Sequence, residues 1–373
     1  MNVRRAFRVA VLAGDGVGPE VTREAVHVLS EVLHAAGHAV ECTEALIGGA
    51  AIDATGEPFP PATREAVRHA DAVLLGAVGG AKWNTQPPTL RPEAGLLALR
   101  KALGTFANLR PVRTLPAMVD ATPLRPEIVR DTDILFVREL TGGAYFGAKS
   151  RVADATGGEV ATDDWRYTTA EIERVVRIAG SLARVRRGHV TSVDKANVLA
   201  TSQLWRDVTT RVLREEFADV TLVHAYVDAF AMQLLREPRA YDVVVTENLF
   251  GDILTDEAAV LAGSIGLLPS ASLGAERADG TRVGLYEPIH GSAPDIAGRD
   301  IANPIGAIAS VGLMLRYSLG LPALADEVDA AVQAALASRA RTRDLVTADE
   351  VSLGTRAMGA AVRACVGAVA LER

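Results

Sequence analysis

Short runs of Val, Ile and Leu alternate along the chain with longer segments in which apolar residues recur at helical spacing. The clearest strand candidates are residues 8–13, 72–78, 133–140, 189–194, 221–227 and 241–246, and the helix candidates include 22–37, 169–185, 197–217 and 303–320. Alternation of this kind is typical of βα units around a sheet of mostly parallel strands. The pattern therefore predicts an α/β fold with a mixed, largely parallel sheet and flanking helices.

One region, residues 144–167, follows neither pattern. It mixes Gly, Thr and Val without a helical period. We interpret it as a hairpin or arm that projects from a domain. Because such an extension commonly packs on another subunit, it predicts an oligomer.

Length, charge and cysteine content narrow the class of protein. A chain of 373 residues is too long for one ordinary core and suggests two domains. The net charge of −7 argues against nucleic acid or an anionic membrane as partner. Only Cys42 and Cys365 are present, so neither a disulfide framework nor a thiolate metal site is expected. The apolar run after the first arginines ends at Gly14, without a full signal-peptide core, and no run approaches 18 apolar residues, which favours a cytoplasmic protein.

Ionisable residues follow several of the predicted strands, at Arg138, Lys195, Asp228 and Asp252. In open α/β sheets ligands bind beyond the carboxyl ends of the strands, so these residues are candidates for a site. If residues 251–263 are helical, Asp252 and Asp256 lie on one face with their Cβ atoms about 5–6 Å apart. A cation between the two carboxylates would relieve their repulsion. Oxygen ligands alone would select Mg²⁺ or Mn²⁺. The alternative is that Asp252 caps the helix and Asp256 favours its dipole.

Arginines form a second cluster. Arg100 and Arg110 lie ten residues apart, and with Arg138 they could present planar forks to carboxylates. Leu96 and Leu97 lie on the same helical face as Arg100. A ligand held there would carry both acidic groups and an apolar side chain.

The third cluster is the stretch 286–304, in which Gly, Ser, Pro, Asp and Asn follow no period. Long loops in compact domains are usually functional, although a structural turn is the alternative. Asp295 could accept two ribose hydroxyls, and its charge would repel a 2′-phosphate. The glycines of "GDGVGPE", residues 14–20, do not match the dinucleotide fingerprint, because Gly18 comes one position early and Pro19 starts the helix.

Several segments together carry a family resemblance. They include "GDGVGPE", "FANLRP", "VRELTGG", "SVDKANVL", "NLFGDILTDEAAVLAG" and "HGSAPDIAG". In this order, over nearly the whole chain, they resemble the β-decarboxylating dehydrogenases, the family of isocitrate and isopropylmalate dehydrogenases. The resemblance implies the two-domain fold of that family rather than a classical Rossmann fold. It places an outer domain at 1–105 and 263–373, a central domain at 106–262 and a dimerisation arm at about 144–167.

The resemblance also implies roles for individual residues. The catalytic residues would be Tyr145 and Lys195, and the metal ligands Asp228, Asp252 and Asp256. The substrate would contact Arg100, Arg110, Arg138, Asp228, Leu96, Leu97 and Val198. The cofactor would contact Gly80 and Glu93 in the segment 80–93, and His290, Gly291, Ser292, Ala293, Asp295, Ile296 and Asn303 in the long loop.

The implied activity is NAD-dependent and Mg²⁺- or Mn²⁺-dependent oxidative decarboxylation by a homodimer, in which Lys195 and Asp228 act across the interface. An apolar pocket of Leu96, Leu97 and Val198 favours isopropylmalate over isocitrate, with malate or tartrate as the alternative. Departures from the family pattern are Ala13, Ala144 and Glu247, and Glu247 would add negative charge near Asp252. Since no catalytic or metal position is missing, a paralogue without turnover is disfavoured.

Overall fold

The computed structural model describes residues 5–346 and 351–367, and the chain divides into two compact units. Unit 1 comprises Met1–Thr105, Thr114–Pro126 and Ala262–Arg373, and unit 2 comprises Phe106–Arg113 and Glu127–Leu261. The segment Thr114–Pro126 therefore groups with unit 1, whereas the sequence interpretation assigned it to the central domain. No helix in the described part of the chain is long and apolar enough to cross a membrane.

Unit 1 contains five strands in the order β2-β1-β3-β12-β11. They are β1 (Ala6–Gly14), β2 (Ala39–Glu44), β3 (Ala72–Ala77), β11 (Pro269–Glu276) and β12 (Arg282–Pro288). All neighbours are parallel except β11 and β12, and Leu12 of β1 lies beside Leu75 of β3 in the register. Both leucines are fully buried in a core that includes Ile47, Leu99 and Leu285.

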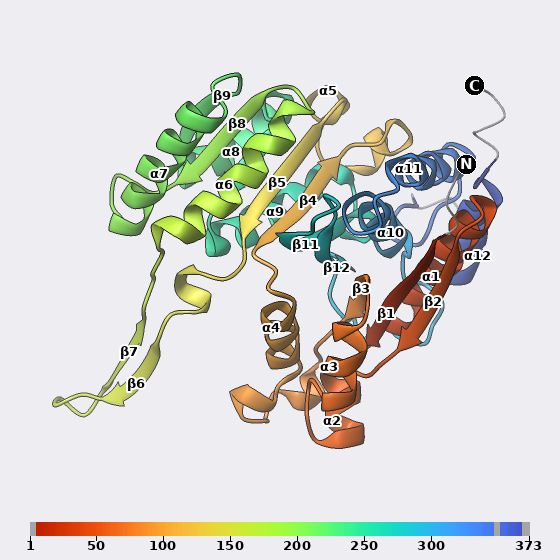
Figure 1. The fold of residues 1–373 in the computed structure, drawn as a ribbon, viewed down its shortest axis with the longest axis horizontal. Coiled ribbons are helices and arrows are strands. Elements are labelled where there is room, and N and C mark those ends of the chain that lie inside the picture. Colours follow the sequence, from red (N-terminus) through yellow and green to blue (C-terminus); the bar gives the residue numbers. More distant parts are fainter. Residues whose placement is uncertain (1–4, 347–350, 368–373) are drawn as a thin grey trace. The chain divides into compact units, whose positions relative to one another are not determined.

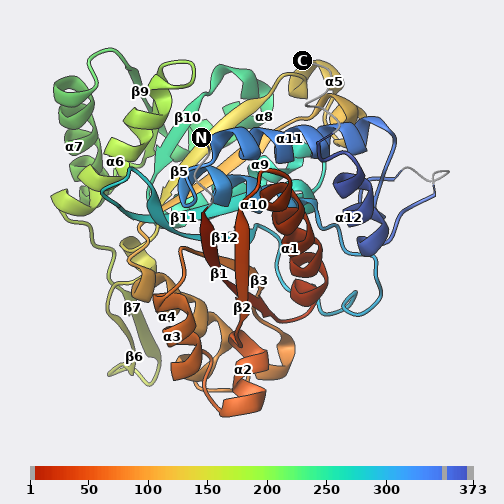
Figure 2. The same ribbon diagram turned by 45° about the vertical axis from the view of Figure 1, so that its right-hand side comes forward.

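The helices of unit 1 are α1 (Gly18–Ala35), α2 (Gly48–Thr55), α3 (Pro61–Arg68), α4 (Pro92–Leu103), α10 (Ile305–Tyr317), α11 (Pro322–Ala337) and α12 (Thr355–Ala364). Helix α10 contacts β11, β12, α1 and α11, and α1 runs alongside β1 and β2 (Figure 2). Val21, Val28 and Val32 recur on the buried face of α1, which begins with Pro19 in its first turn. This spacing is the apolar stripe that a core-facing helix requires.

Unit 2 contains five strands in the order β4-β5-β10-β8-β9. They are β4 (Ala107–Arg113), β5 (Asp133–Glu139), β8 (His189–Asp194), β9 (Thr221–Tyr226) and β10 (Val243–Thr246). Only β4 and β5 are antiparallel, and the central strand β10 is buried throughout. Its helices are α5 (Pro126–Val129), α6 (Thr169–Arg184), α7 (Ala200–Glu216), α8 (Val227–Arg236) and α9 (Asn248–Ala262), with α6 against β5, β8 and β10 (Figure 1).

Short 3₁₀ turns complete the elements of both units. They are η1 (Ala81–Trp83), η2 (Pro88–Leu90), η3 (Pro116–Ala121), η4 (Gly143–Tyr145), η5 (Pro238–Ala240) and η6 (Ile265–Leu267). All six predicted strands and all four predicted helices are present, so the α/β fold with a largely parallel sheet is confirmed. Strands β2, β4, β11 and β12 were not predicted.

The projecting region is a two-stranded antiparallel ribbon of β6 (Lys149–Ala153) and β7 (Glu159–Asp163). It extends away from the rest of unit 2 (Figure 1). Every residue of both strands is exposed, including Val152 and Val160. The predicted hairpin is therefore present, and both of its faces are uncovered in a single chain.

Candidate active site

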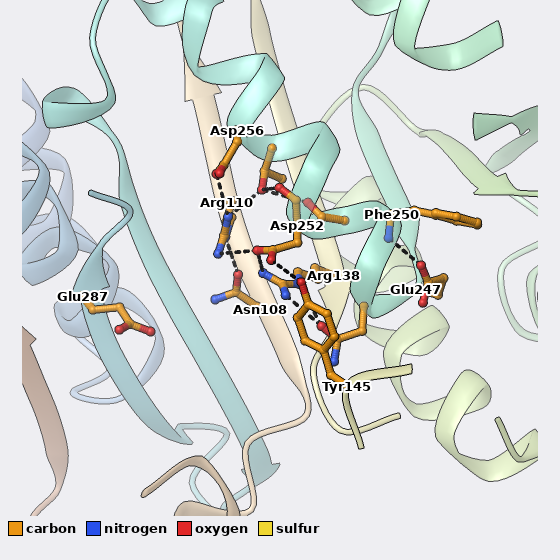
Figure 3. A network of polar contacts seen from close by, with 12 residues as sticks. Asn108, Arg110, Arg138, Tyr145, Glu247, Phe250, Asp252, Asp256 and Glu287 are labelled. Atoms are coloured by element: carbon orange, nitrogen blue, oxygen red, sulfur yellow. Dashed lines mark hydrogen bonds and ion pairs between the residues drawn. The ribbon is translucent and has the colours of Figure 1, made fainter. Parts of the chain in front are cut away.

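Three residues that the sequence singled out meet around the carboxylate of Asp252 in unit 2 (Figure 3). Arg138 Nη1 forms an ion pair with Asp252 Oδ1, and the Tyr145 hydroxyl donates to Asp252 Oδ2 at 2.7 Å. Arg138 lies near the end of β5 and pairs with Thr246, two residues before α9 begins. The parallel pairing of β5 and β10 therefore brings the first turns of α9 to Arg138.

Arg110 of β4 lies against the same face of α9. Its Nη2 is 3.7 Å from Asp252 Oδ1, and its Nη1 is 3.6 Å from Asp256 Oδ1. Two buried bonds hold the guanidinium, from Nε to Asn108 Oδ1 at 2.7 Å and from Nη1 to Thr255 Oγ1 at 2.6 Å. Asp252 and Asp256 thus share one helical face, as their spacing predicts. The alternative role of Asp252 as the helix cap is wrong, because α9 begins at Asn248.

The electrostatic environment separates the ionisable groups of this cluster. Burial raises the pKa of Asp252, but the charges of Arg138 and Arg110 and the Tyr145 hydroxyl lower it more, so that the net shift is downward. Burial and the charge of Asp252 hold the pKa of Asp256 above its usual value, although Arg110 opposes them. Burial and the hydrogen bond to Asp252 raise the pKa of Tyr145 to about 12. At neutral pH Asp252 is therefore charged and Tyr145 keeps its proton.

The donor chemistry of this face fits a hard divalent cation. Asp252 and Asp256 offer only oxygen ligands, which Mg²⁺ and Mn²⁺ prefer. Their side chains are 35% and 65% exposed, so both are accessible. Among residues 5–346 and 351–367, no group of three His, Cys, Asp or Glu side chains is arranged to hold a metal. Asp252 and Asp256 are thus the two carboxylates that this face of α9 presents.

Lys195 and Asp228 form a pair at a different place in unit 2. Lys195 follows β8, Asp228 lies in the first turn of α8, and Lys195 Nζ is 2.8 Å from Asp228 Oδ2. The parallel neighbours β8 and β9 end side by side, which explains the contact. The hydrogen bond from Lys195 lowers the pKa of Asp228. Val198, three residues beyond Lys195, is 67% exposed and makes an apolar surface beside this pair.

Arg100 belongs to unit 1, where it lies on α4. Its Nη2 pairs with Glu287 Oε1 of β12 at 3.0 Å, and its Nε is buried without a hydrogen-bond partner. Leu97 is 38% exposed, whereas Leu96 packs against the core of unit 1. Of the two leucines, Leu97 is the one whose surface is free for a ligand. Glu287 was missed by the sequence interpretation because β12 was not predicted.

A cavity of about 710 Å³ lies in unit 1 along the long loop. Six of the predicted cofactor residues line it, namely His290, Gly291, Ala293, Asp295, Ile296 and Asn303. The side chain of Ser292 is buried, and its carbonyl accepts the N–H of Val17 at 2.8 Å. Burial lowers the pKa of His290, which favours the neutral ring.

The sequence interpretation missed Arg343 and Asp344, which also line this cavity. Asp344 accepts bonds from Ser264 Oγ at 2.5 Å and from Asn303 Nδ2 at 3.0 Å. It thereby ties Asn303 to a segment 41 residues further along the chain. Gly80 and Glu93 do not line the cavity and lie on the separate segment 80–93 of unit 1.

Glu247 is a buried carboxylate at the start of α9. It is 4% exposed, accepts the N–H of Phe250 at 2.5 Å and accepts the Tyr167 hydroxyl at 3.1 Å. Figure 3 shows the carboxylate turned toward Phe250, at the start of α9. Burial raises the pKa of Glu247. Its carboxylate stabilises the first turn of the helix, and its charge also acts on the Asp252 cluster, where it helps to raise the pKa of Tyr145.

Asn248 is a supporting residue that sequence reasoning missed. Its Oδ1 accepts bonds from Arg138 Nε at 3.2 Å and Nη2 at 2.8 Å, and its Nδ2 donates to the carbonyl of Gly142 at 3.3 Å. It therefore orients Arg138 and holds the loop that leads to Tyr145. The signal that could have found it was its position at the start of the segment "NLFGDILTDEAAVLAG", three residues before the predicted helix 251–263.

Known proteins resemble this chain over almost its entire length. The family model described as Isocitrate/isopropylmalate dehydrogenase matches residues 8–362. The 3-isopropylmalate dehydrogenases of Moorella thermoacetica and Salinibacter ruber are each 56% identical and match 96% of this chain, and 98% and 95% of their own lengths. Among solved structures, the isocitrate dehydrogenase from Methylococcus capsulatus has a TM-score of 0.83 and 32% identity, with 96% of this chain and 99% of that chain covered.

Proposed function

The chain belongs to the isocitrate/isopropylmalate dehydrogenase family, and we propose that it catalyses the NAD-dependent oxidative decarboxylation of 3-isopropylmalate to 4-methyl-2-oxopentanoate and CO₂ in leucine biosynthesis. The chain is an oxidoreductase that acts on a small molecule, and its family uses a nucleotide cofactor and a divalent metal. The observation that carries the substrate is the 56% identity, over nearly the full length of both chains, to relatives named for it.

Arginines bind and orient the substrate in this proposal. Arg110 and Arg138 are 8% and 3% exposed, and Asn108 and Asn248 fix the directions of their guanidinium groups. Planar forks held in this way match carboxylates and cost little ordering when the substrate binds. Arg100 supplies a third fork, and Leu97 beside it meets the isopropyl group. A third carboxylate, as in isocitrate, would face an apolar surface there without a partner.

Two side chains move protons. Lys195 would act as the general base for the proton of the C2 hydroxyl, and a bound nicotinamide would supply the hydride acceptor. After CO₂ is lost, Tyr145 donates a proton to C3. A pKa of about 12 keeps the phenol protonated at neutral pH, so that the proton is available when C3 is protonated. Asp252 and Asp256, with Asp228 of a second copy, would hold Mg²⁺ or Mn²⁺, a Lewis acid that favours ionisation of the hydroxyl and loss of CO₂.

The active assembly in this proposal is a homodimer in which Lys195 and Asp228 serve the other copy. A two-stranded ribbon alone is marginally stable in water, and both faces of β6 and β7 are exposed. Val152 and Val160 are 56% and 48% exposed, so a second copy has apolar surface to cover. Asp228, whose side chain is 67% exposed, would supply a further carboxylate across that interface.

The preference for NAD rests on Asp295. It is exposed on the wall of the cavity in unit 1, where a carboxylate can accept two ribose hydroxyls and repel a 2′-phosphate. The test is NADH absorbance with isopropylmalate, D-malate and isocitrate side by side, each with NAD and with NADP, in the presence of Mg²⁺. We expect the highest kcat/KM with isopropylmalate and NAD. A higher value with D-malate, or with NADP, would overturn the substrate or the cofactor assignment respectively.

A further inference from the structure

The turn between β1 and α1, residues 14–20, takes no part in the proposed chemistry. It does not match the dinucleotide fingerprint, although three glycines, Gly14, Gly16 and Gly18, directly follow the predicted strand 8–13. In the structure it is connected to both segments of unit 1 to which we assign the cofactor, to one through Gly79, the residue directly before it, and to the other by direct contact. These are the segment 80–93 after β3 and the loop 290–303 after β12.

Asp15 connects the turn to the first of these segments. It is 5% exposed, and its Oδ2 accepts the N–H groups of Gly49 and Gly79, both at 2.8 Å. Its Oδ1 accepts the N–H of Ala50 at 2.7 Å. Gly49 and Ala50 open α2, and Gly79 leads directly into the segment 80–93. One buried carboxylate thus joins the β1 turn, the start of α2 and the start of a cofactor segment.

Helix α2 makes a second connection to the same segment. Asp53, one turn beyond the groups that Asp15 binds, accepts bonds from Lys82 Nζ at 2.5 Å and from Trp83 Nε1 at 3.1 Å. A Cβ on Gly49 would lie 2.2 Å from the Trp83 ring. The position of Trp83 therefore depends on the position of the first turn of α2. Asp15 holds that turn through the N–H groups of Gly49 and Ala50.

Glu20 connects the turn to the long loop. Its Oε1 accepts the N–H of Gly298 at 2.5 Å, and its Oε2 accepts the N–H of Asp300 at 3.1 Å. The N–H of Val17 donates to the carbonyl of Ser292 at 2.8 Å. The loop is thereby held to the first turn of α1 at three points, on both sides of Asp295.

The glycine spacing follows from these contacts. Gly14 and Gly16 have φ angles of 72° and 59°, and a Cβ on either would lie 1.9 Å from a carbonyl oxygen, that of Ala77 or Ser292. A Cβ on Gly48 would lie 2.6 Å from Asp15 Oδ2. The glycines therefore permit close contact between protein backbones, a role different from the close approach to a pyrophosphate.

We propose that Asp15 and Glu20 are positioning residues of the cofactor site, Asp15 for the segment 80–93 and Glu20 for the loop 290–303. Neither needs to touch the cofactor. This inference rests on the proposed function, because that function assigns the two segments to NAD. The proposal gives the turn 14–20 a structural role, which differs from the direct binding of a nucleotide that its glycines suggest.

The test measures NADH affinity and local backbone exchange in the full-length protein. In Asp15→Asn the amide NH₂ faces an N–H donor, and in Glu20→Gln the same mismatch arises at Gly298 or Asp300. We expect each variant to bind NADH about tenfold more weakly by fluorescence titration, because hydrogen bonds to a charged group are lost. In the protein without ligands, hydrogen exchange should accelerate at 79–93 in Asp15→Asn and at 292–300 in Glu20→Gln, each without the other.

Asp242→Asn is the matched control. Asp242 is 1% exposed and also accepts a backbone N–H, that of Arg187 at 2.9 Å, but it lies in unit 2 at the start of β10. It should lower Tm and leave the Kd of NADH unchanged. If the wild type binds NADH while Asp15→Asn and Glu20→Gln bind it equally well, the positioning roles are refuted and the proposed function stands. If the wild type binds neither NADH nor NADPH, the proposed function fails and this inference fails with it.

Discussion

Replacing Tyr145 by Phe removes a single hydroxyl and isolates the proton donor of the proposed reaction. In the structure that hydroxyl donates to Asp252, and Asp252 remains paired with Arg138 when it is gone. Tyr145 is 39% exposed, so water can replace the bond, and the loss of folding stability should be about 1 kcal/mol, below the usual value for a bond to a charged group. Loss of a positioned acid costs much more, roughly 10²- to 10⁴-fold in kcat.

The assay for Tyr145→Phe is steady-state NADH formation together with the kinetic isotope effect of substrate deuterated at C2. We expect kcat to fall by about 10²- to 10⁴-fold and the isotope effect to approach unity, because protonation of C3 becomes slower than hydride transfer. The KM for isopropylmalate should change little, since the arginines bind its carboxylates.

The pH profile gives a second reading of the same residue. A phenol with a pKa of about 12 is in its active, protonated form throughout the neutral range, and activity that depends on it is lost only as pH rises toward that value. If activity falls with rising pH well below pH 12, another group must be responsible, and the same fall should persist in Tyr145→Phe. Tyr241→Phe, a half-buried tyrosine elsewhere in unit 2, is the control. A kcat within about threefold of wild type in Tyr145→Phe would refute the role as acid.

Substitutions at three other positions test substrate choice, the base and pH-dependent stability. Leu97→Ser should raise the KM for isopropylmalate by about 5- to 30-fold, through loss of roughly 1–2 kcal/mol of apolar contact, and leave kcat/KM for D-malate unchanged. Lys195→Met should abolish turnover while circular dichroism and Tm remain near wild type, because its partner Asp228 is 67% exposed and water can solvate the carboxylate when the ion pair is lost. Glu139 is fully buried, and burial raises its pKa above the usual value of 4.5. The stability that its protonated form contributes is therefore complete below pH 4.5 and declines as pH rises through the raised pKa. Urea unfolding should therefore show the free energy of unfolding of wild type, relative to Glu139→Gln, falling from pH 4 upward; a rising difference would contradict the assignment.

The elements that could be predicted from sequence are those whose pattern is local. Strand β10 is a run of three valines buried on both faces, and α9 repeats its acidic residues at helical spacing. Strand β4 contains Pro111 between two arginines, and β11 is rich in small residues, so neither has a strand pattern of its own. These strands form because neighbouring strands present unpaired backbone groups to them. A local sequence pattern does not reveal those neighbours.

The same distinction applies to the site. The acidic face of α9 follows from spacing within one helix, and the contact of Asp252 with Arg138 follows from the expectation that parallel strands end together. The supporting contacts of Asn248 with Gly142 and of Arg100 with Glu287 span 106 and 187 residues. No local pattern specifies such pairs, since they depend on the register of strands that are far apart in sequence.

The strand order of unit 1 also means that β3 is synthesised long before one of its two neighbouring strands. One side of β3 pairs with β1 soon after both leave the ribosome, but its other side pairs with β12, about 210 residues later. At synthesis rates of about 5–20 residues per second, the backbone groups on that side of β3 remain unpaired for roughly 10–40 s. Residues 127–261 are complete before then, so unit 2 can assemble first, while the apolar edge of β3 stays open to pairing with other chains. Nascent-chain aggregation should therefore peak at lengths short of residue 288.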